Sequence, residues 1–599
     1  MNLHELVSDL IKDTKGSPAG SFLEFTADSS LRAFLPELIL CATILLTLLV
    51  RVFKIGRLVN AFYIVLPGSL LALYFAASAT NVTRMEIFTG MLVYDGLAVY
   101  IRSAILLFTV LFVVFTKLTG IPDHDDGPDI YSLVLGATLG MCLMVSANHM
   151  LTVFLGVEMA SVPSYVLAGL MKGRRKASEA ALKYAVYGAG AAGVMLYGIS
   201  LLAGLLNSAH LPTMAVQLAE RFPQMNGSER MVLAFGGLTI AVGLAFKLSA
   251  VPFHFWAPDV FEGATAEVGA FLSVASKAAA LALLVRVAVG LSAIPPQSES
   301  PGDRTAAAAT TATSPKMAAL YNVASEEVKE AAAPAAEPDK CGAEITAAQA
   351  RIEASTELAP VRAFTAQLIA FFAALTCTFG NFAAYGQTNI KRLLAYSTIA
   401  HAGYMMMPVA AMVALIGINN LAAERALAAL GIYIATYLFM NLGAFAVVAF
   451  LRNAFRSEEI SDYAGLIRRC PVTVVCFALI LFSLVGLPPL AGFIGKFAAF
   501  AAVADAYRQV QAAGQNGFYL LLLLIIGGLN TAVSLYYYLR IVKVMTIDEE
   551  SRDRPPFTYS DVSLAGAFLW LLTLPTVGLI LNPNWLSEWT IAAAKHLFF

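Results

Sequence analysis

Four ionisable side chains stand well inside long apolar stretches of the sequence: Glu158, Lys247, Lys277 and Lys496. A charged side chain at membrane depth costs about 2.5–3.5 kcal/mol even on the lenient scale from insertion experiments. None of the four lies close enough to an end of its stretch to reach water easily by snorkelling. They are therefore candidate functional groups. Three other cations stand near the ends of such stretches and are expected to anchor them at the membrane surface: Lys54, Arg286 and Lys543.

A lysine and a glutamate at this depth can work together as a proton switch. Loss of hydration favours the neutral amine of a buried lysine, whereas a nearby carboxylate favours the ammonium. A change in their separation therefore changes whether the lysine holds its proton. The alternative is a static buried ion pair that fixes packing and carries no proton. Three lysines with one carboxylate on a neighbouring helix favour a relay over that alternative.

Prolines interrupt the stretches that hold two of these lysines. Pro252 follows Lys247 by five residues, and Pro488 and Pro489 precede Lys496 by eight and seven residues. A helix break at membrane depth is tolerated only where the backbone lines a cavity or is buried in protein. Broken helices at matching places in two halves of a chain are typical of the transport site of an inverted-repeat transporter. The spacing predicts two such breaks here.

Two histidines are further candidates as proton carriers. His401 stands in LLAYSTIAHAGYMMMP, at the place in the second half of the chain that corresponds to Glu158 in the first half. Histidine titrates near physiological pH and shuttles protons, although a buried histidine can equally be a hydrogen-bonded structural residue. We include His401 in the candidate relay. His254, directly beyond Pro252, is a weaker candidate.

The composition of the chain indicates an all-α membrane protein. Its 599 residues are 59% hydrophobic and 13% charged, with a mean hydropathy of +0.73. Soluble proteins carry about 25% charged residues. The net charge of −1 gives no argument for a nucleic-acid partner. Residues 1–33 contain no apolar segment of the kind that a cleavable signal peptide needs.

About fourteen stretches are long and apolar enough to span a bilayer. Their approximate limits are 34–53, 59–79, 95–117, 129–148, 149–171, 181–206, 231–252, 264–290, 361–385, 390–415, 425–451, 471–500, 517–544 and 562–582. Lysine and arginine gather in the loops that follow odd-numbered stretches. This bias predicts that those loops face the cytoplasm and that both termini lie on the opposite side.

The predicted breaks lie five stretches apart and divide the chain into repeats. We expect a polar segment at 1–33, three spans in 34–128, a first five-helix unit in 129–292 and a second unit of opposite topology in 361–545, with the last span and the C-terminus in 546–599. Residues 293–360 are rich in Ala, Thr, Pro and Glu and lack the residues that build a core. They are predicted to be a low-complexity, non-cytoplasmic insert that the fold tolerates.

Two further features of the sequence do not indicate a functional site. GAGAAG at Gly188–Gly193 matches a dinucleotide-binding motif, but that motif needs a strand before it and a helix after it. Here it lies within a predicted membrane helix, where small residues allow close packing. The six cysteines form no C-x-x-C pair, so neither a metal site nor an iron–sulfur site is expected.

Several stretches resemble the antiporter-like membrane subunits of respiratory complex I. They are FKLSAVPFHFWAPDVFEGA, SKAAALALLVRV, NIKRLLAYSTIAHAGYM and LPPLAGFIGKF, and the likeness extends from about residue 34 to about residue 582 without the insert. The resemblance implies that Glu158, Lys247, Lys277 and Lys496 are the ionisable residues of helices 5, 7, 8 and 12. In the L- and M-type members helix 8 typically carries histidine, and in the M type helix 12 carries glutamate. Lysine at both positions therefore favours the N-type members.

The resemblance also implies a function and its partners. The expected activity is proton translocation within an NADH:quinone oxidoreductase, in the bacterial cytoplasmic (inner) membrane, driven by electron transfer in other subunits. The chain itself is expected to bind no cofactor, because NADH, flavin, iron–sulfur clusters and quinone belong to those subunits. Its partners are the neighbouring antiporter-like and small membrane subunits, together with lipid. The alternatives are an Mrp-type sodium/proton antiporter subunit and a structural membrane scaffold without an ion path.

Overall fold

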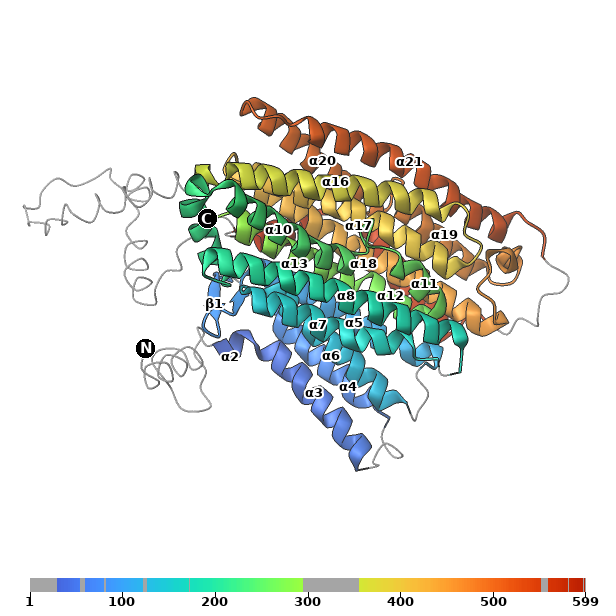
Figure 1. The fold of residues 1–599 in the computed structure, drawn as a ribbon. Coiled ribbons are helices and arrows are strands. Elements are labelled where there is room, and N and C mark those ends of the chain that lie inside the picture. The colour runs from blue at the N-terminus through green and yellow to red at the C-terminus, as the bar shows by residue number, and fades with distance from the viewer. Residues whose placement is uncertain are drawn as a thin grey trace, which may run out of the picture.

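The computed structural model describes residues 30–53, 60–79, 82–121, 126–171, 173–294, 355–550, 559–579, 581–595 and 597. In this part of the chain nearly all of the regular structure is α-helix, and most of the helices run side by side (Figure 1). Eleven helices are long and apolar enough to cross a membrane, and three shorter apolar helices accompany them at Phe62–Ala77, Pro471–Val485 and Leu564–Gly578. The predicted all-α membrane architecture is confirmed.

The elements before residue 295 are α2 (Ser30–Ala33), α3 (Leu35–Val52), α4 (Phe62–Ala77), β1 (Met85–Ile87), β2 (Leu92–Tyr94), α5 (Gly96–Thr119), α6 (Gly127–Ser146), α7 (Met150–Ala168), α8 (Arg175–Leu206), α9 (Leu211–Arg221), η2 (Phe222–Gln224), α10 (Gly227–Leu248), α11 (Trp256–Gly263), α12 (Ala266–Ser273) and α13 (Ala275–Ser292). After residue 354 come α16 (Ala359–Ala384), α17 (Ile390–Leu415), α18 (Asn420–Phe455), η4 (Ile460–Tyr463), η5 (Leu466–Arg468), α19 (Pro471–Val485), α20 (Ala491–Ala512), α21 (Phe518–Thr546), α22 (Leu564–Gly578) and α23 (Asn584–Ala594).

The helices form an inner group and an outer group. In their most apolar windows, 94% of the residues of α17 and 94% of those of Ala266–Ser292 are buried, against 28% for α3 and 28% for α21. Figure 1 shows α3 and α21 at opposite edges of the bundle. The outward-facing apolar side chains of the outer helices are exposed in the isolated chain, as expected for side chains that contact lipid in the membrane. The deepest positions of the fold are thus on α12, α13, α17 and α18, where α17 contacts both α13 and α18.

Two spans are interrupted where the prolines predicted a break. α10 ends at Leu248, and the next residue, Ser249, adopts a left-handed conformation with φ of 57°. Pro252 lies in the connection before α11, and a proline cannot donate a backbone hydrogen bond. The helix ends four residues before the predicted limit of 252. Lys247 therefore lies in the last turn of α10, rather than within a continuing helix.

The second interruption separates α19 from α20. α19 ends at Val485 and is followed by Gly486, whose φ of 89° suits a residue without a side chain. Pro488 and Pro489 follow, and α20 begins at Ala491. A smaller discontinuity at Val274 separates α12 from α13. It places Lys277 in the first turn of α13, whereas the sequence suggested the middle of one long helix.

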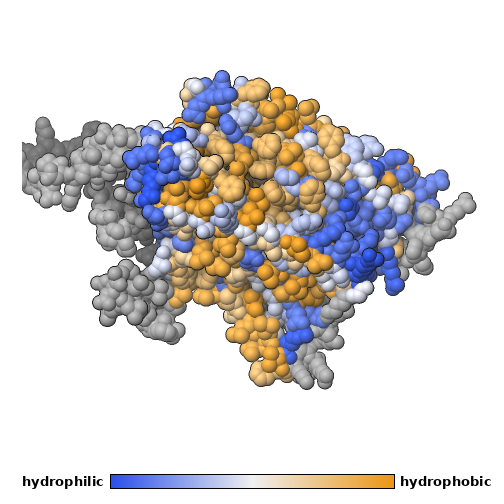
Figure 2. Space-filling view, in the orientation of Figure 1, coloured by the Kyte–Doolittle hydropathy of each residue, from blue (hydrophilic) through white to orange (hydrophobic). Residues whose placement is uncertain are grey.

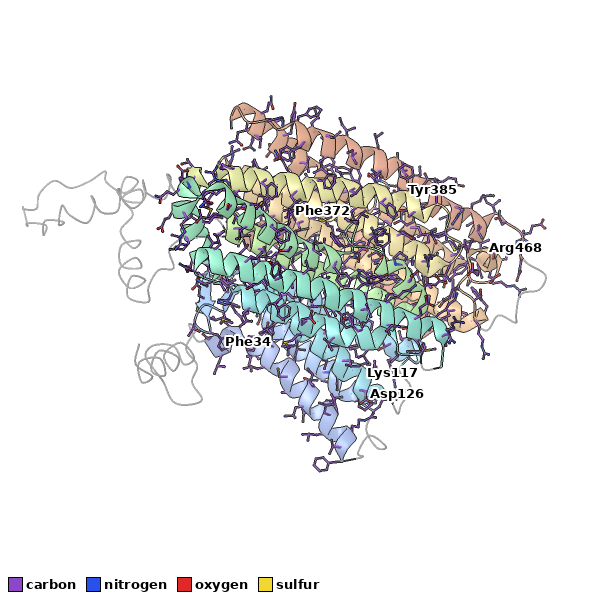
Figure 3. The ribbon with its side chains drawn as sticks, in the orientation of Figure 1. Phe34, Lys117, Asp126, Phe372, Tyr385 and Arg468 are labelled. Atoms are coloured by element: carbon purple, nitrogen blue, oxygen red, sulfur yellow. The ribbon has the colours of Figure 1, made fainter. Side chains whose placement is uncertain are left out.

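Loops from distant parts of the sequence meet at one end of the bundle around a polar depression of about 900 Å³. The charged residues that line it are Arg174, Arg175, Lys176, Glu262, Lys391, Arg452, Arg456, Glu458 and Glu459. Apart from Lys391, which lies in the first turn of α17, they belong to connections that follow odd-numbered predicted spans, so these Lys- and Arg-rich loops do share one end. Figure 2 shows hydrophilic residues gathered there and hydrophobic residues across the middle of the same face. In Figure 3, Lys117, Asp126 and Arg468 lie toward this end, away from Phe34.

One predicted membrane anchor is wrong. Arg286 is 6% exposed and donates from Nη1 and Nη2 to the two carboxylate oxygens of Asp95, at 2.5 and 2.6 Å. Its Nε also donates to Val145 O at 2.9 Å. The guanidinium is buried because three hydrogen bonds satisfy it, so it has no need to reach the membrane surface. Lys543 is exposed as expected, and Lys54 lies outside the described residues.

The GAGAAG segment lies inside α8, as the packing interpretation requires. A side chain at Gly188 would stand 2.0 Å from the hydroxyl of Tyr165 on α7, so glycine is needed for the approach of these helices. Gly190 and Gly193 face open space, so close packing explains only the first glycine of the motif. The insert predicted at 293–360 lies outside the described residues except at its ends.

Candidate functional site

Glu158 and Lys247 lie close together without forming an ion pair. Glu158 is half-buried on α7, and its Oε1 is buried with no hydrogen-bond partner in the described structure. Lys247 is 2% exposed, and its Nζ donates to Ser161 Oγ of α7 at 2.9 Å. The charges of Glu158 and Lys247 interact, but no nitrogen–oxygen approach within 4.0 Å joins the two described side chains. The lysine therefore has a neutral partner one helical turn from the carboxylate.

Lys277 meets the same break from the other side. Its ammonium, 2% exposed, donates to Leu248 O at 2.6 Å. Leu248 is the last residue of α10 and follows Lys247 directly. Carbonyl groups at a helix C-terminus lack partners within the helix and carry partial negative charge, which a cation satisfies. The break thus places Lys277 at the end of the helix that carries Lys247.

Lys496 has the same role at the second break. It lies on α20 with 4% exposure, and its Nζ donates to Val485 O, the last carbonyl of α19, at 2.8 Å. The ammonium also stands 4.5 Å from the centre of the Tyr404 ring on α17, a cation–π distance. At each interruption, the last carbonyl of the helix before the break therefore accepts a hydrogen bond from a buried lysine of a later helix.

His401 lies within hydrogen-bonding reach of two hydroxyl groups. On α17, its Nδ1 is 2.9 Å from the hydroxyl of Tyr433 and its Nε2 is 3.3 Å from that of Tyr538. Tyr538 is also hydrogen-bonded to Ser397 Oγ. A neutral imidazole donates at one nitrogen and accepts at the other, and each hydroxyl can do either. The ring can therefore change tautomer and pass a proton between the two tyrosines. The charge of Lys496 acts on His401.

The predicted site residues form two clusters. Glu158, Lys247 and Lys277 surround the break after α10, whereas His401 and Lys496 lie together in the second half of the chain. In the described residues no hydrogen bond joins Lys277 to His401. Helices α13 and α17, which carry them, are in contact. His254 is buried against Phe379, with ring centroids 4.4 Å apart, and its Nδ1 has no hydrogen-bond partner in the described structure.

Sequence reasoning missed several polar residues that contact the site. Ser161, Tyr433 and Tyr538 are common residue types in membrane helices and gave no signal of their own. Sequence reasoning also missed four ion pairs that each have at least one buried partner, because the two partners of each pair lie far apart in the sequence. They are Glu37–Arg102 at 2.8 Å, Asp95–Arg286 at 2.5 Å, Glu267–Arg452 at 3.1 Å and Lys391–Glu458 at 2.9 Å. Lys391, in the first turn of α17, is 3% exposed and donates to Ala264 O at 2.6 Å.

Ion pairs hold α11 at the polar end of the bundle. Asp259 stands 2.6 Å from Lys183 Nζ of α8 and 2.8 Å from Arg392 Nη1 of α17. Glu262 stands 2.8 Å from Lys176 Nζ and 2.9 Å from Arg392 Nη1. Burial raises the pKa of both carboxyls, but hydrogen bonds and charges from these cations outweigh it and hold each pKa below its usual value. The segment beyond the first break is thus tied to α8 and α17.

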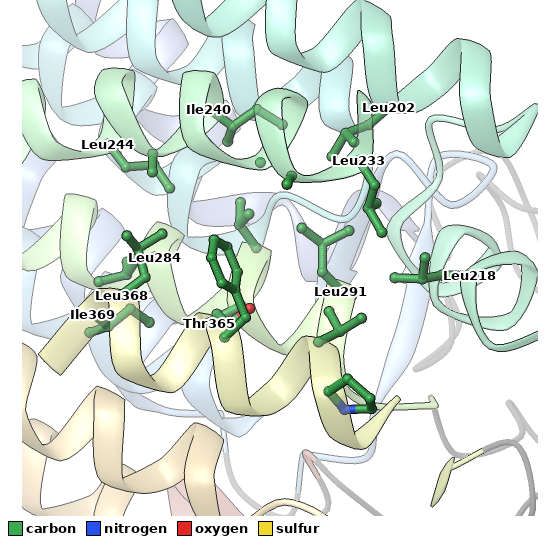
Figure 4. Close-up of a pocket in the computed structure, with 18 of the residues that line it drawn as sticks. Leu202, Leu218, Leu233, Ile240, Leu244, Leu284, Leu291, Thr365, Leu368 and Ile369 are labelled. Atoms are coloured by element: carbon green, nitrogen blue, oxygen red, sulfur yellow. The ribbon is translucent and has the colours of Figure 1, made fainter. Parts of the chain in front are cut away.

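A separate cavity of about 260 Å³ lies between α10, α13 and α16 (Figure 4). Leucine, isoleucine, valine, alanine and phenylalanine dominate its lining, with Arg230 and Thr365 as its charged and hydroxyl residues. Such a lining offers few groups that could pass a proton. No group of three or more His, Cys, Asp or Glu side chains suited to a metal ion occurs in the part of the chain that the structure describes.

Comparisons with known proteins agree on one family. The family model described as NADH:quinone oxidoreductase/Mrp antiporter, TM, matches residues 147–297 and 347–516, so the gap in the match falls in the predicted insert. NADH-quinone oxidoreductase subunit N of Anaeromyxobacter sp. (strain Fw109-5) is 36% identical over 542 residues, with 88% of this chain and 90% of the relative covered. The same subunit of Chlorobium chlorochromatii (strain CaD3) is 33% identical over 568 residues, covering 93% and 94%.

Solved structures share the fold. A chain of respiratory complex I from Thermus thermophilus with bound Aureothin superposes with a TM-score of 0.62 and 27% identity, covering 92% of this chain and 98% of that one. A chain of the Mrp complex from Dietzia sp. DQ12-45-1b has a TM-score of 0.68 at 17% identity, covering 95% and 97%, which shows the fold alone. By sequence and structure, this chain belongs to the NADH-quinone oxidoreductase subunit N family.

Proposed function

We propose that this chain is a proton-translocating membrane subunit of an NADH:quinone oxidoreductase. The observation that carries the proposal is the matched pair of helix breaks, each ending on a buried lysine. Lys277 donates to the last carbonyl of α10 and Lys496 to the last carbonyl of α19. A buried ammonium at a helix end is held without a carboxylate, so its proton is free to leave when the local charge changes. Family membership supplies the complex in which this chemistry is used.

The relay we propose begins at Glu158 and Lys247. When the carboxylate is near, the lysine holds its proton; when they separate, the lysine releases it. Lys277 receives the proton as a neutral amine, after it has passed its own proton on, from its position on Leu248, the residue after Lys247. His401 carries it onward between its two tyrosines to Lys496, which passes it out. Electron transfer in other subunits supplies the energy through a conformational change, and NADH, flavin, iron–sulfur clusters and quinone are bound there.

We also infer the arrangement in the membrane. The fourteen predicted spans include the three shorter apolar helices, with helices 4–8 and 9–13 as two inverted units. The polar depression lined by lysine and arginine faces the cytoplasm, because positive loops stay on that side. Both termini then lie on the other side of a bacterial inner membrane. The partners are the adjacent antiporter-like and small membrane subunits of the complex.

The test is the number of protons moved per electron in the assembled complex. Lys247→Ala should abolish or strongly reduce proton translocation while electron transfer from NADH to quinone continues. Lys543→Ala, at an exposed lysine near a span end, is the control and should leave the ratio unchanged. An unchanged ratio in Lys247→Ala would refute the proposal. If the chain is an antiporter subunit, it should be isolated without NADH-oxidising subunits. If it is a structural scaffold, the lysine variants should impair assembly of the complex, but the complex that still assembles should translocate protons normally.

A further inference from the structure

Ser161 stands between the two groups that begin the proposed relay. It lies on α7 three residues after Glu158, which places both on one face of that helix. Ser161 is 2% exposed, and its Oγ accepts a hydrogen bond from Lys247 Nζ at 2.9 Å. Adjacent positions at this spacing are about 5–6 Å apart. The ammonium of Lys247 can therefore pass from one to the other by a change of side-chain rotamer, without movement of either helix.

The hydroxyl of Ser161 can serve the lysine only as an acceptor. Its single hydrogen is donated to Val157 O at 2.6 Å, within α7. The remaining lone pairs point away from that bond and are available to the ammonium, which has donors and no acceptor. The ammonium of Lys247 is therefore the donor of this hydrogen bond, and the Ser161 oxygen is its acceptor. Glu158 Oε1, buried and without a hydrogen-bond partner in the described structure, is the competing acceptor.

We propose that Ser161 is a positioning residue that holds Lys247 away from Glu158, so that the lysine alternates between a neutral and an anionic acceptor on one helix face. This rests on the proposed function of the Glu158–Lys247 pair. A neutral hydroxyl solvates the ammonium without stabilising its charge as a carboxylate does. The lysine therefore keeps its proton when it contacts Glu158 and gives it up more readily when it contacts Ser161. Contact with Ser161 is thus the state in which Lys247 releases its proton.

Ser161 and Glu158 are the two acceptors that we consider for Lys247, and other titratable groups lie nearby. On α7 they are Glu158 and Tyr165, on α8 Tyr184, and on α13 Lys277. Lys277 repels a second ammonium and donates to Leu248 O. The buried hydroxyl of Tyr184 has no hydrogen-bond partner in the described structure. Tyr165 interacts with Ser161 itself. Of all these side chains and Ser161, only Ser161 accepts a hydrogen bond from Lys247 Nζ in the described structure.

Ser161→Ala tests the proposal in the assembled, membrane-bound complex. Without the hydroxyl, Lys247 rests against Glu158, and release of its proton requires a higher pH. We expect the acid side of the pH profile of proton translocation to move up by about one unit, a tenfold change in the protonation equilibrium. Ser161→Thr keeps the hydroxyl and should restore the wild-type profile. Ser161→Cys, a weak acceptor of similar size, should move the profile in the same direction by less.

The matched control is Ser164→Ala. Ser164 is fully buried on the same helix and donates to Ala160 O at 2.6 Å, as Ser161 does to Val157 O, but among the described residues no lysine donates to it. Its loss should leave the pH profile in place. Equal shifts in the two alanine variants, no shift in Ser161→Ala, or failure of threonine to restore the profile would each overturn the role of Ser161. Normal translocation in Lys247→Ala would instead overturn the proposed function, whatever Ser161 does.

Discussion

The ammonium of Lys277 caps the helix that ends one residue after Lys247, through a 2.6 Å hydrogen bond to Leu248 O. Lys247, the residue before Leu248, directs its own ammonium to Ser161 of α7 instead. The end of α10 therefore stabilises the ammonium of Lys277, because the last carbonyl of a helix carries partial negative charge.

Lys277→Met should remove both the proton carrier and the cap. We expect loss of proton translocation, together with destabilisation of about 1.5–3 kcal/mol, because a hydrogen bond from a charged group is lost and a buried carbonyl is left without a donor. The measurements are protons per electron and the temperature at which the assembled complex loses quinone reduction. Lys277→Arg, which keeps the donors and cannot release its proton, should preserve most of the stability but none of the translocation. Translocation at the wild-type level in either variant would contradict the assignment.

The ring of Tyr404 should matter to Lys496 more than its hydroxyl does. The ammonium stands 4.5 Å from the ring centre, an interaction of about 2 kcal/mol when desolvated. Tyr404→Phe keeps the ring and should retain translocation close to the wild-type rate. Tyr404→Leu removes it and should lower the rate at least severalfold. The two variants are compared in inverted membrane vesicles by the quenching of a pH-sensitive dye, and equal rates would show that the ring has no role.

The buried pair of Asp95 and Arg286 should behave as a structural unit. Removing one partner leaves an uncompensated buried charge, at a cost of about 3–5 kcal/mol. We expect Arg286→Met to reduce assembly and thermal stability strongly. Asp95→Asn combined with Arg286→Met should recover much of the loss, because neither charge then remains. The test is a double-mutant comparison of thermal unfolding, and a double variant no better than Arg286→Met alone would argue against a buried pair.

The carboxyl groups of α11 should make part of the stability depend on pH. Their cation partners hold the pKa of Asp259 below its usual value, although burial alone would raise it. Stability from a carboxyl with a lowered pKa is present above the pKa of the unfolded chain, about 3.9, and is lost as the pH falls through the folded value. Asp259→Asn should therefore cost about 1 kcal/mol at pH 7, with the difference from wild type shrinking below about pH 4.

Thermal unfolding in detergent between pH 7 and pH 3 measures this difference. The control is Asp505→Asn, at a partly exposed carboxyl whose arginine partner lies 3.5 Å away on the same helix. Its effect should be smaller at every pH. A constant difference between Asp259→Asn and wild type down to pH 3 would show that the carboxyl has no lowered pKa.

Much of the fold could be predicted from the sequence because hydrocarbon demands long apolar helices. The breaks near Pro252 and Pro488 could be predicted as well, since a proline cannot donate a backbone hydrogen bond. The exact end of α10 could not, and its position decides that Lys247 lies at a helix terminus. The partners of the lysines also could not be predicted. A backbone carbonyl such as Leu248 O or Val485 O is present at every residue, so only the geometry shows which one a lysine meets.

Arg286 shows how position in a stretch can mislead. It stands near the end of its predicted span, where a snorkelling cation is the ordinary expectation. Its partner, Asp95, is 191 residues away in sequence. Neither local pattern nor hydropathy links the two, and only packing of α13 against the start of α5 does. The four lysine and glutamate positions were easier to single out, because their depth alone made them costly.

The segment between α10 and α11 has a mechanical consequence. α11 is fastened to α8 through Lys183 and to α17 through Arg392, both by way of Asp259. α10, on the other side of the break, carries Lys247 in its last turn. Residues 249–255 therefore connect a helix that is held by ion pairs to the end of the helix that carries Lys247. A displacement of α17 relative to α8 would therefore reach the end of α10 through Asp259 and this connection.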